Sequence, residues 1–123
     1  MISEIYKTVL RDRRYEVVSA YNKQSALKYI DEHRPDLILL DLMIPIGPGE
    51  ELITYDHPVG FDILEWLHHH EQYRTIPVVI LTNLDSDMHK EHAEKLGARE
   101  YLVKANLEPH DVVRYVDALA PSK

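Results

Sequence analysis

Two runs of consecutive apolar residues constrain the fold more than any other feature of this sequence. The first, Leu37–Leu40, lies between two aspartates, and the second is Val78–Leu81. Neither run alternates with polar residues, and a strand of this kind is typically buried on both faces of a parallel sheet. A shorter run, Tyr101–Val103, has the same character. These runs predict a parallel sheet covered by helices on each side.

Stretches with helical periodicity separate the apolar runs. The expected helices are a first one with an apolar stripe of Ile2, Ile5, Tyr6, Val9 and Leu10, a second from Asn22 to before Pro35, and three more at Phe61–His70, Ser86–Leu96 and Pro109–Leu119. A further short strand is expected at Tyr15–Ala20, which is rich in β-branched residues. Strands that alternate with helices at this spacing predict an α/β fold built from right-handed βαβ units.

Residues 46–59 do not fit this alternation. Gly47, Pro48, Gly49 and Pro58 interrupt any long element in this stretch. We expect a loop inserted after the strand that ends at Asp41. Connections of this length are uncommon in compact domains and are often functional.

Composition limits the partners that the chain can take. The 123 residues include 14 Lys and Arg, 21 Asp and Glu, and no Cys, which gives a formal charge of −7. This length is typical of one domain. An acidic chain disfavours direct binding to nucleic acid or to an anionic membrane. No apolar run is long enough to span a bilayer. We therefore expect a cytoplasmic domain without cysteine chemistry.

A polar residue follows or ends each of the three apolar runs. In parallel α/β sheets, ligands bind at this edge, outside the carboxyl ends of the strands. The three polar residues are Asp41, Thr82 and Lys104. Each one alone is adequately explained as the point where a buried strand meets water. Together they predict a carboxylate, a hydroxyl and an ammonium at one edge. This combination suits a phosphoryl group on Asp41, with the carboxylate as nucleophile and the other two groups stabilising the phosphoryl oxygens.

Four segments of the sequence resemble, in order, the receiver domain of two-component response regulators. They are DLILLDLMIP (36–45), GFDILEWL (60–67), IPVVILTN (76–83) and AEKLGAREYLVKANL (93–107). The resemblance implies a flavodoxin-like receiver fold, in which helices and a doubly wound parallel sheet form three α/β/α layers.

The resemblance also implies roles for individual residues. Asp41 is the phosphoacceptor, which takes a phosphoryl group from a histidine kinase or a phosphotransfer protein. Thr82 and Tyr101 are switch residues, and Lys104 is the basic partner of the acylphosphate. The carboxylate of Asp41 and the backbone carbonyl of Met43 are ligands of Mg²⁺. Such a domain signals by contact with a downstream protein and is not itself an enzyme.

The sequence departs from the family at its start. Family receivers begin with a strand that ends in adjacent acidic residues, whereas this sequence begins with an expected helix. We therefore expect residues 1–123 to form an N-terminally incomplete receiver. Its Mg²⁺ binding should be weak, because that ion requires several oxygen ligands. Glu50, Glu51 and Asp85 are candidates to approach the edge in place of the acidic pair.

A missing strand leaves backbone groups of its neighbours unpaired. Another segment of the chain, with Leu52–Tyr55 as a remote candidate, or another molecule would have to fill the gap. An open edge is also compatible with dimerisation by strand exchange.

Other functions stay open at this point. One is a pseudo-receiver, which binds partners without being phosphorylated. A small α/β enzyme or a flavin-binding protein is less favoured, because no Gly-rich phosphate loop follows any of the apolar runs. His89 and His92 lie one turn apart and could hold a metal, although such a pair on an exposed helix is more often solvated.

Overall fold

A parallel sheet lies at the centre of the protein, whose computed structural model describes residues 4–45, 47 and 58–120. Within these residues the sheet has three strands in the order β1-β2-β3. They are β1 (Ile38–Leu40), β2 (Val78–Thr82) and β3 (Glu100–Val103). The register places Leu40 beside Ile80 and Thr82 beside Val103, so the carboxyl ends of the strands meet at one edge.

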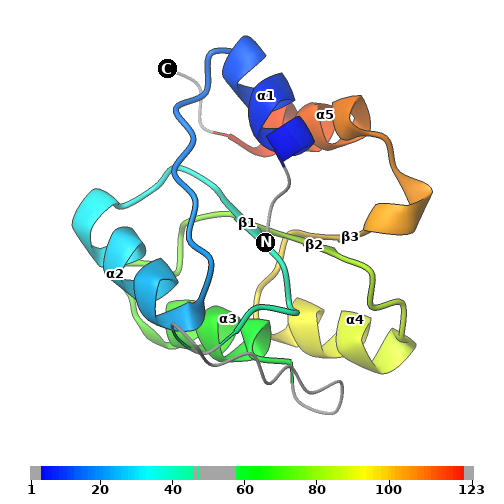
Figure 1. The fold of residues 1–123 in the computed structure, drawn as a ribbon. Helices are drawn as coiled ribbons and strands as arrows, with labels where there is room; N and C mark the ends of the chain where they lie inside the picture. Colours follow the sequence, from blue (N-terminus) through cyan, green and yellow to red (C-terminus); the bar gives the residue numbers. More distant parts are fainter. Residues whose placement is uncertain (1–3, 46, 48–57, 121–123) are drawn as a thin grey trace.

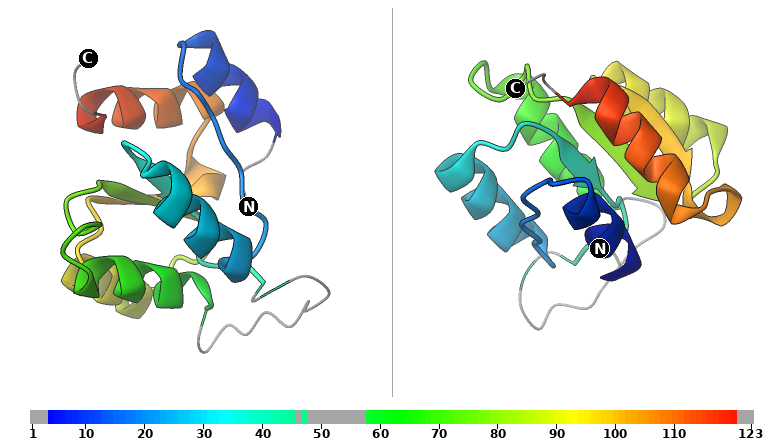
Figure 2. Two further views of the ribbon diagram at one scale, coloured as in Figure 1. Left: turned by 90° about the vertical axis from the view of Figure 1, so that its left-hand side faces the viewer. Right: turned by 90° about the horizontal axis from the view of Figure 1, so that it is seen from above.

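Helices cover both faces of this sheet (Figure 1). On one face lie α1 (Glu4–Asp12) and α5 (Pro109–Leu119), and on the other lie α2 (Lys23–His33), α3 (Gly60–His69) and α4 (Asp87–Lys95). A short 3-10 turn, η1 (Lys104–Asn106), follows β3. The two further views show the same three layers (Figure 2). The α/β/α arrangement confirms the expected fold class.

The apolar runs are buried because successive side chains of β2 enter different cores. Val78 and Ile80 pack with α2 and α3, whereas Val79 and Leu81 pack with α5. All five residues of β2 are buried. Removing one such side chain from water stabilises the fold by about 1.5–3 kcal/mol. An unbroken apolar run is therefore what a strand between two helical layers requires.

The helix ends follow from local chemistry. The side chain of Asn22 accepts a hydrogen bond from the backbone of Ser25, at 2.8 Å, and so caps α2. Glu108 and Asp111 form a reciprocal capping box at the start of α5, where Pro109 occupies the first turn. Such caps satisfy amide groups that have no partner within the helix. After α4 the chain turns at Gly97, whose φ of +90° favours a residue without a side chain.

The strand expected at Tyr15–Ala20 is wrong. These residues are extended, but they pair with no strand among the described residues. In Figure 2 the segment crosses from α1 to α2 outside the sheet. A β-branched run favours an extended backbone, but it becomes a strand only when a neighbour accepts its hydrogen bonds.

Two smaller expectations also need correction. The side chain of Ile5 is 62% exposed, because α1 packs on α5 mainly through its later residues, such as Leu10. The strand expected at Leu37–Leu40 covers Ile38–Leu40. The predicted loop 46–59 lies outside the described residues except for positions 47, 58 and 59. Its interpretation as an insertion therefore stays a prediction.

Candidate functional site

The three residues that end the apolar runs occupy the same edge of the sheet. Asp41 follows β1 directly, Thr82 is the last residue of β2, and Lys104 follows β3. The parallel register brings these ends to one level, since Thr82 lies beside Val103. Ligands of α/β sheets bind at this edge. The sequence prediction that these residues converge is consistent with this geometry.

Asp41 and Lys104 are in direct contact. The Lys104 ammonium donates to Oδ2 of Asp41 at 2.7 Å, and the backbone amide of Met43 donates to Oδ1 at 2.9 Å. The side chain of Asp41 is only 10% exposed. Burial by itself would raise the pKa of this carboxyl. The hydrogen bonds from Lys104 and Met43, together with nearby positive charge, outweigh that effect and lower the pKa below its usual value. Asp41 is therefore a carboxylate at neutral pH.

Thr82 is fully buried at the end of β2. Its hydroxyl oxygen accepts a hydrogen bond from the backbone amide of Leu84, at 3.4 Å. The hydroxyl proton is not engaged by that bond, because the oxygen acts as an acceptor. Thr82 thus supplies a hydroxyl at the edge where Asp41 and Lys104 meet.

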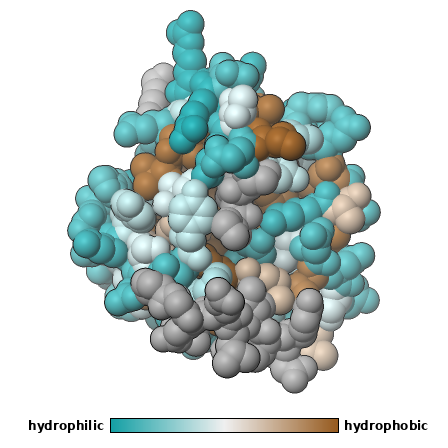
Figure 3. Space-filling model, viewed as in Figure 1, coloured by the Kyte–Doolittle hydropathy of each residue, from teal (hydrophilic) through white to brown (hydrophobic). Residues whose placement is uncertain are grey.

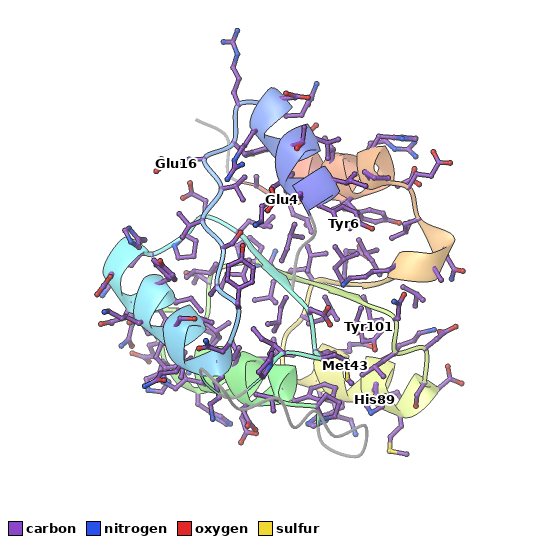
Figure 4. All side chains as sticks on the ribbon, viewed as in Figure 1. Glu4, Tyr6, Glu16, Met43, His89 and Tyr101 are labelled. Carbon is purple, nitrogen blue, oxygen red and sulfur yellow. The ribbon has the colours of Figure 1, made fainter. Side chains whose placement is uncertain are left out.

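Tyr101 connects β3 to the loop that follows Thr82. Its hydroxyl donates to the carbonyl of Leu84 at 2.8 Å. Burial, together with the nearby charges of Asp85 and Asp41, raises the pKa of Tyr101 to about 12. The phenol therefore stays neutral and keeps its proton for this bond. Figure 4 shows Tyr101 and Met43 on the side of the molecule where the strands end.

Gly60 is a site residue to which sequence reasoning gave no role. Its amide donates to the carbonyl of Leu42 at 2.9 Å. A side chain at this position would place Cβ 2.5 Å from the Cα of Leu42 and 2.8 Å from the carbonyl oxygen of Asp41. The start of α3 therefore packs directly on the backbone beside Asp41. The only signal in the sequence was a glycine at the beginning of an apolar helix.

Few side chains among the described residues could hold magnesium. No cluster of three His, Cys, Asp or Glu side chains that could hold a metal is found among them. Asp41 supplies one carboxylate, which already pairs with Lys104. Asp85 forms an ion pair with Lys90 at 2.6 Å. Glu50 and Glu51 lie outside the described residues.

The two histidines of α4 contact an aromatic ring. His92 stacks on Phe61, with ring centroids 4.4 Å apart, and His89 approaches the same ring at 5.7 Å. The Nδ1 atom of His89 is buried and has no hydrogen-bond partner among the described residues. In the same part of the chain, the two histidines belong to no group of three side chains that could hold a metal.

Comparisons with known proteins identify the family. The family model described as the response regulator receiver domain matches residues 1–117. This chain belongs to that family. The polar-differentiation response regulator DivK of Brucella anthropi is 26% identical over 116 residues, which are 94% of this chain and 82% of DivK.

Solved receiver domains share the fold. The receiver domain of the Francisella response regulator 1452 has a TM-score of 0.74 and 26% identity, with 94% of this chain and 84% of that chain covered. A second neighbour is the receiver domain of a sensor histidine kinase from Pseudomonas aeruginosa, which has magnesium in its active-site cleft. Its TM-score is 0.72 at 20% identity, with 94% and 84% of the two chains covered. The chain is thus a receiver domain of two-component signalling with the flavodoxin-like fold. In the described part of the chain, no helix is long and apolar enough to cross a membrane.

Proposed function

We propose that this receiver domain accepts a phosphoryl group on Asp41 from the phosphohistidine of a histidine kinase or a phosphotransfer protein. The observation that carries the proposal is the contact of 2.7 Å between the Lys104 ammonium and a nearly buried Asp41 carboxylate. A carboxylate that ended a strand only by chance would gain most from contact with water. Here it is held instead by a cation and a backbone amide at the ligand-binding edge of the sheet.

The chemistry needs few groups. A carboxylate oxygen of Asp41 attacks phosphorus, the P–N bond to the donor imidazole breaks, and its electron pair stays on the imidazole nitrogen. Lys104 is placed to offset the charge of the phosphoryl oxygens, and Thr82 can donate its hydroxyl proton to one of them. Water hydrolyses the acylphosphate later and restores Asp41. We infer that the domain turns over no other substrate and so is not an enzyme in the usual sense.

The downstream signal is a contact with another protein. Thr82, Leu84 and Tyr101 form a connected path from the phosphoryl site to β3. A phosphoryl oxygen on Asp41 would accept the proton of the Thr82 hydroxyl. Reorienting that hydroxyl would change its bond to the Leu84 amide and so the loop that Tyr101 holds. We infer a cytoplasmic location, because the kinases and effectors of such relays act there. We also infer that any Mg²⁺ held by Asp41 and the Met43 carbonyl is bound weakly, with so few oxygen ligands.

The proposal is tested by treating residues 1–123 with acetyl phosphate in the presence and absence of millimolar Mg²⁺. Intact mass spectrometry should show a phosphoryl adduct that disappears in Asp41→Asn. The matched control is Asp36→Asn, which removes the exposed carboxylate at the other end of the same apolar run and should keep the adduct. An adduct that survives in Asp41→Asn would contradict the assignment. A folded chain with no adduct at all would leave phosphorylation-independent partner binding as its function.

A further inference from the structure

A hollow of about 420 Å³ lies on the outer side of α3, beside the start of α2. Its lining residues are Lys23, Asp62, Glu65, Trp66, His69 and His70. Figure 2 shows α2 and α3 side by side, and an ion pair of 3.5 Å between Lys23 and Asp62 joins their starts. No residue of the phosphoryl site lines this hollow, so a ligand here would be recognised by different chemistry.

Three aromatic rings form a cluster at the end of α3. The indole of Trp66 stacks on the ring of Tyr73, with centroids 4.7 Å apart, and the imidazole of His70 lies 5.0 Å from the same indole. Tyr73 and His70 are only 6.2 Å from each other, so they cannot lie on opposite faces of the indole. Tyr73 is buried, whereas Trp66 is partly exposed. The face of the indole that neither ring covers is the one through which Trp66 can line the hollow.

The same cluster already holds one cation. The guanidinium carbon of Arg34 lies over the ring of Tyr73, 5.6 Å from its centroid. Aromatic faces attract cations through the ring quadrupole, and tryptophan does so most strongly. The uncovered face of Trp66 is therefore a suitable position for a second cation.

Glu65 supplies the charge that would hold such a cation. Its side chain is 55% exposed and lines the hollow. Among the described residues its carboxylate pairs only with His69, at 3.9 Å, which is too long for a hydrogen bond, and His69 is charged only when it is protonated. The other acidic lining residue, Asp62, is compensated by Lys23. The hollow thus has one carboxylate in excess, next to an aromatic face.

An aromatic face beside a carboxylate favours arginine over other cations. A guanidinium is planar and weakly hydrated, so it can stack on the indole while its edge donates two hydrogen bonds to the carboxylate. An ammonium is a compact, strongly hydrated charge and gains less from stacking. The surface over α2 is mostly hydrophilic (Figure 3), so a partner here gains little from broad apolar contact. The formal charge of −7 also attracts a basic partner.

We propose that the hollow binds an arginine side chain from a basic segment of a different protein, with the guanidinium stacked on Trp66 and hydrogen-bonded to Glu65. A second copy of this chain is a poorer occupant, because each copy carries a charge of −7 and repels the other. The contact is additional to the signal through Thr82 and Tyr101, and it does not require phosphorylation of Asp41.

The single tryptophan of the chain makes the hollow directly observable, because its fluorescence and its indole N–H signal in NMR both come from Trp66. The probe is a short peptide of glycine and serine that carries two arginines. Its titration into residues 1–123 should shift the indole signal and saturate. The same peptide with citrulline in place of arginine keeps the shape without the charge and should give no shift. Free arginine amide should bind more weakly than the peptide, because it makes fewer contacts around an open hollow.

A matched pair of variants locates the peptide. Glu65→Gln keeps the shape of the side chain and should weaken binding about fivefold, because it removes the charge that the guanidinium needs. Glu71→Gln makes the same change of charge at an exposed residue that does not line the hollow, and it should leave the affinity unchanged. Circular dichroism checks that both variants fold.

Three outcomes would overturn the proposal. The first is equal binding of the arginine and citrulline peptides, and the second is an equal loss of affinity in Glu65→Gln and Glu71→Gln. The third is an indole signal that shifts with protein concentration before any peptide is added and no longer does so in Glu65→Gln, which would identify a second copy of the chain as the occupant.

Discussion

At the scale of single residues, the ion pair between Asp41 and Lys104 keeps the buried carboxyl of Asp41 ionised. The carboxylate is mostly buried, and two hydrogen bonds compensate for its lost contact with water. The same arrangement predisposes Asp41 to react as a carboxylate, because its pKa lies below the usual range. Stability and reactivity at this position therefore depend on the same partner.

We expect Lys104→Met to reverse the pKa shift of Asp41. Without the ammonium, burial dominates and the pKa of the carboxyl rises. At pH 7 the variant should lose about 3 kcal/mol of unfolding free energy, because a buried charge is left without its partner. Urea unfolding measures the loss, and carbon NMR of the Asp41 carboxyl measures the pKa. The double variant Asp41→Asn/Lys104→Met should regain most of the stability. Equal stability of Lys104→Met and the parent chain would contradict this account.

At the scale of secondary-structure elements, the packing of α3 on the loop after β1 positions Asp41. Gly60 permits this approach, because its amide bonds to Leu42 and its Cα faces the backbone of Asp41 and Leu42. Any side chain at this position would push α3 away from the loop that carries the phosphoacceptor.

Gly60→Ala should therefore destabilise the domain by about 2 kcal/mol, a typical cost of overpacking. All three atoms that the new Cβ would meet belong to backbone and cannot rotate away. Gly47→Ala is the matched control, because among the described residues its Cβ would meet the flexible end of the Gln24 side chain, at 3.3 Å, and no backbone atom. Thermal or urea unfolding of the two variants tests the difference. A loss in Gly47→Ala as large as that in Gly60→Ala would show that close backbone packing is not the cause.

The sequence predicts those elements whose pattern is local. Local signals mark the apolar runs of β1 and β2, the cap at Asn22, the proline that begins α5, and the polar residues that end the strands. The segment at Tyr15–Ala20 was wrongly predicted as a strand because pairing depends on a neighbour that local sequence does not specify. The role of Gly60 was missed for a similar reason, since a contact with Leu42 far away in the chain gives it meaning.

At the scale of the whole molecule, the groups whose pKa values are shifted by folding determine how stability depends on pH. Asp41, Asp111 and Asp117 have lowered pKa values, chiefly through hydrogen bonds from Lys104, from the Glu108 amide and from Tyr15, although burial works against the shift. Lys90 has a raised pKa because it bonds to Asp85, and the pKa of Tyr101 is raised to about 12 mainly by burial.

The unfolding free energy should therefore have a plateau between about pH 5 and pH 9. A carboxyl whose pKa is lowered by folding stabilises the native state above its unfolded pKa, and this contribution disappears as the pH falls through the folded value. Stability should thus decrease below about pH 4. Lys90 and Tyr101 have pKa values that folding raises, so they stabilise the native state below their unfolded pKa values. These contributions disappear as the pH rises above about 10. Urea unfolding from pH 3 to pH 11 measures the profile. In Asp41→Asn the unfolding free energy should decrease less as the pH falls below about 4. An unfolding free energy of the wild-type chain that increases as the pH falls below about 4 would show that these interactions do not stabilise the fold.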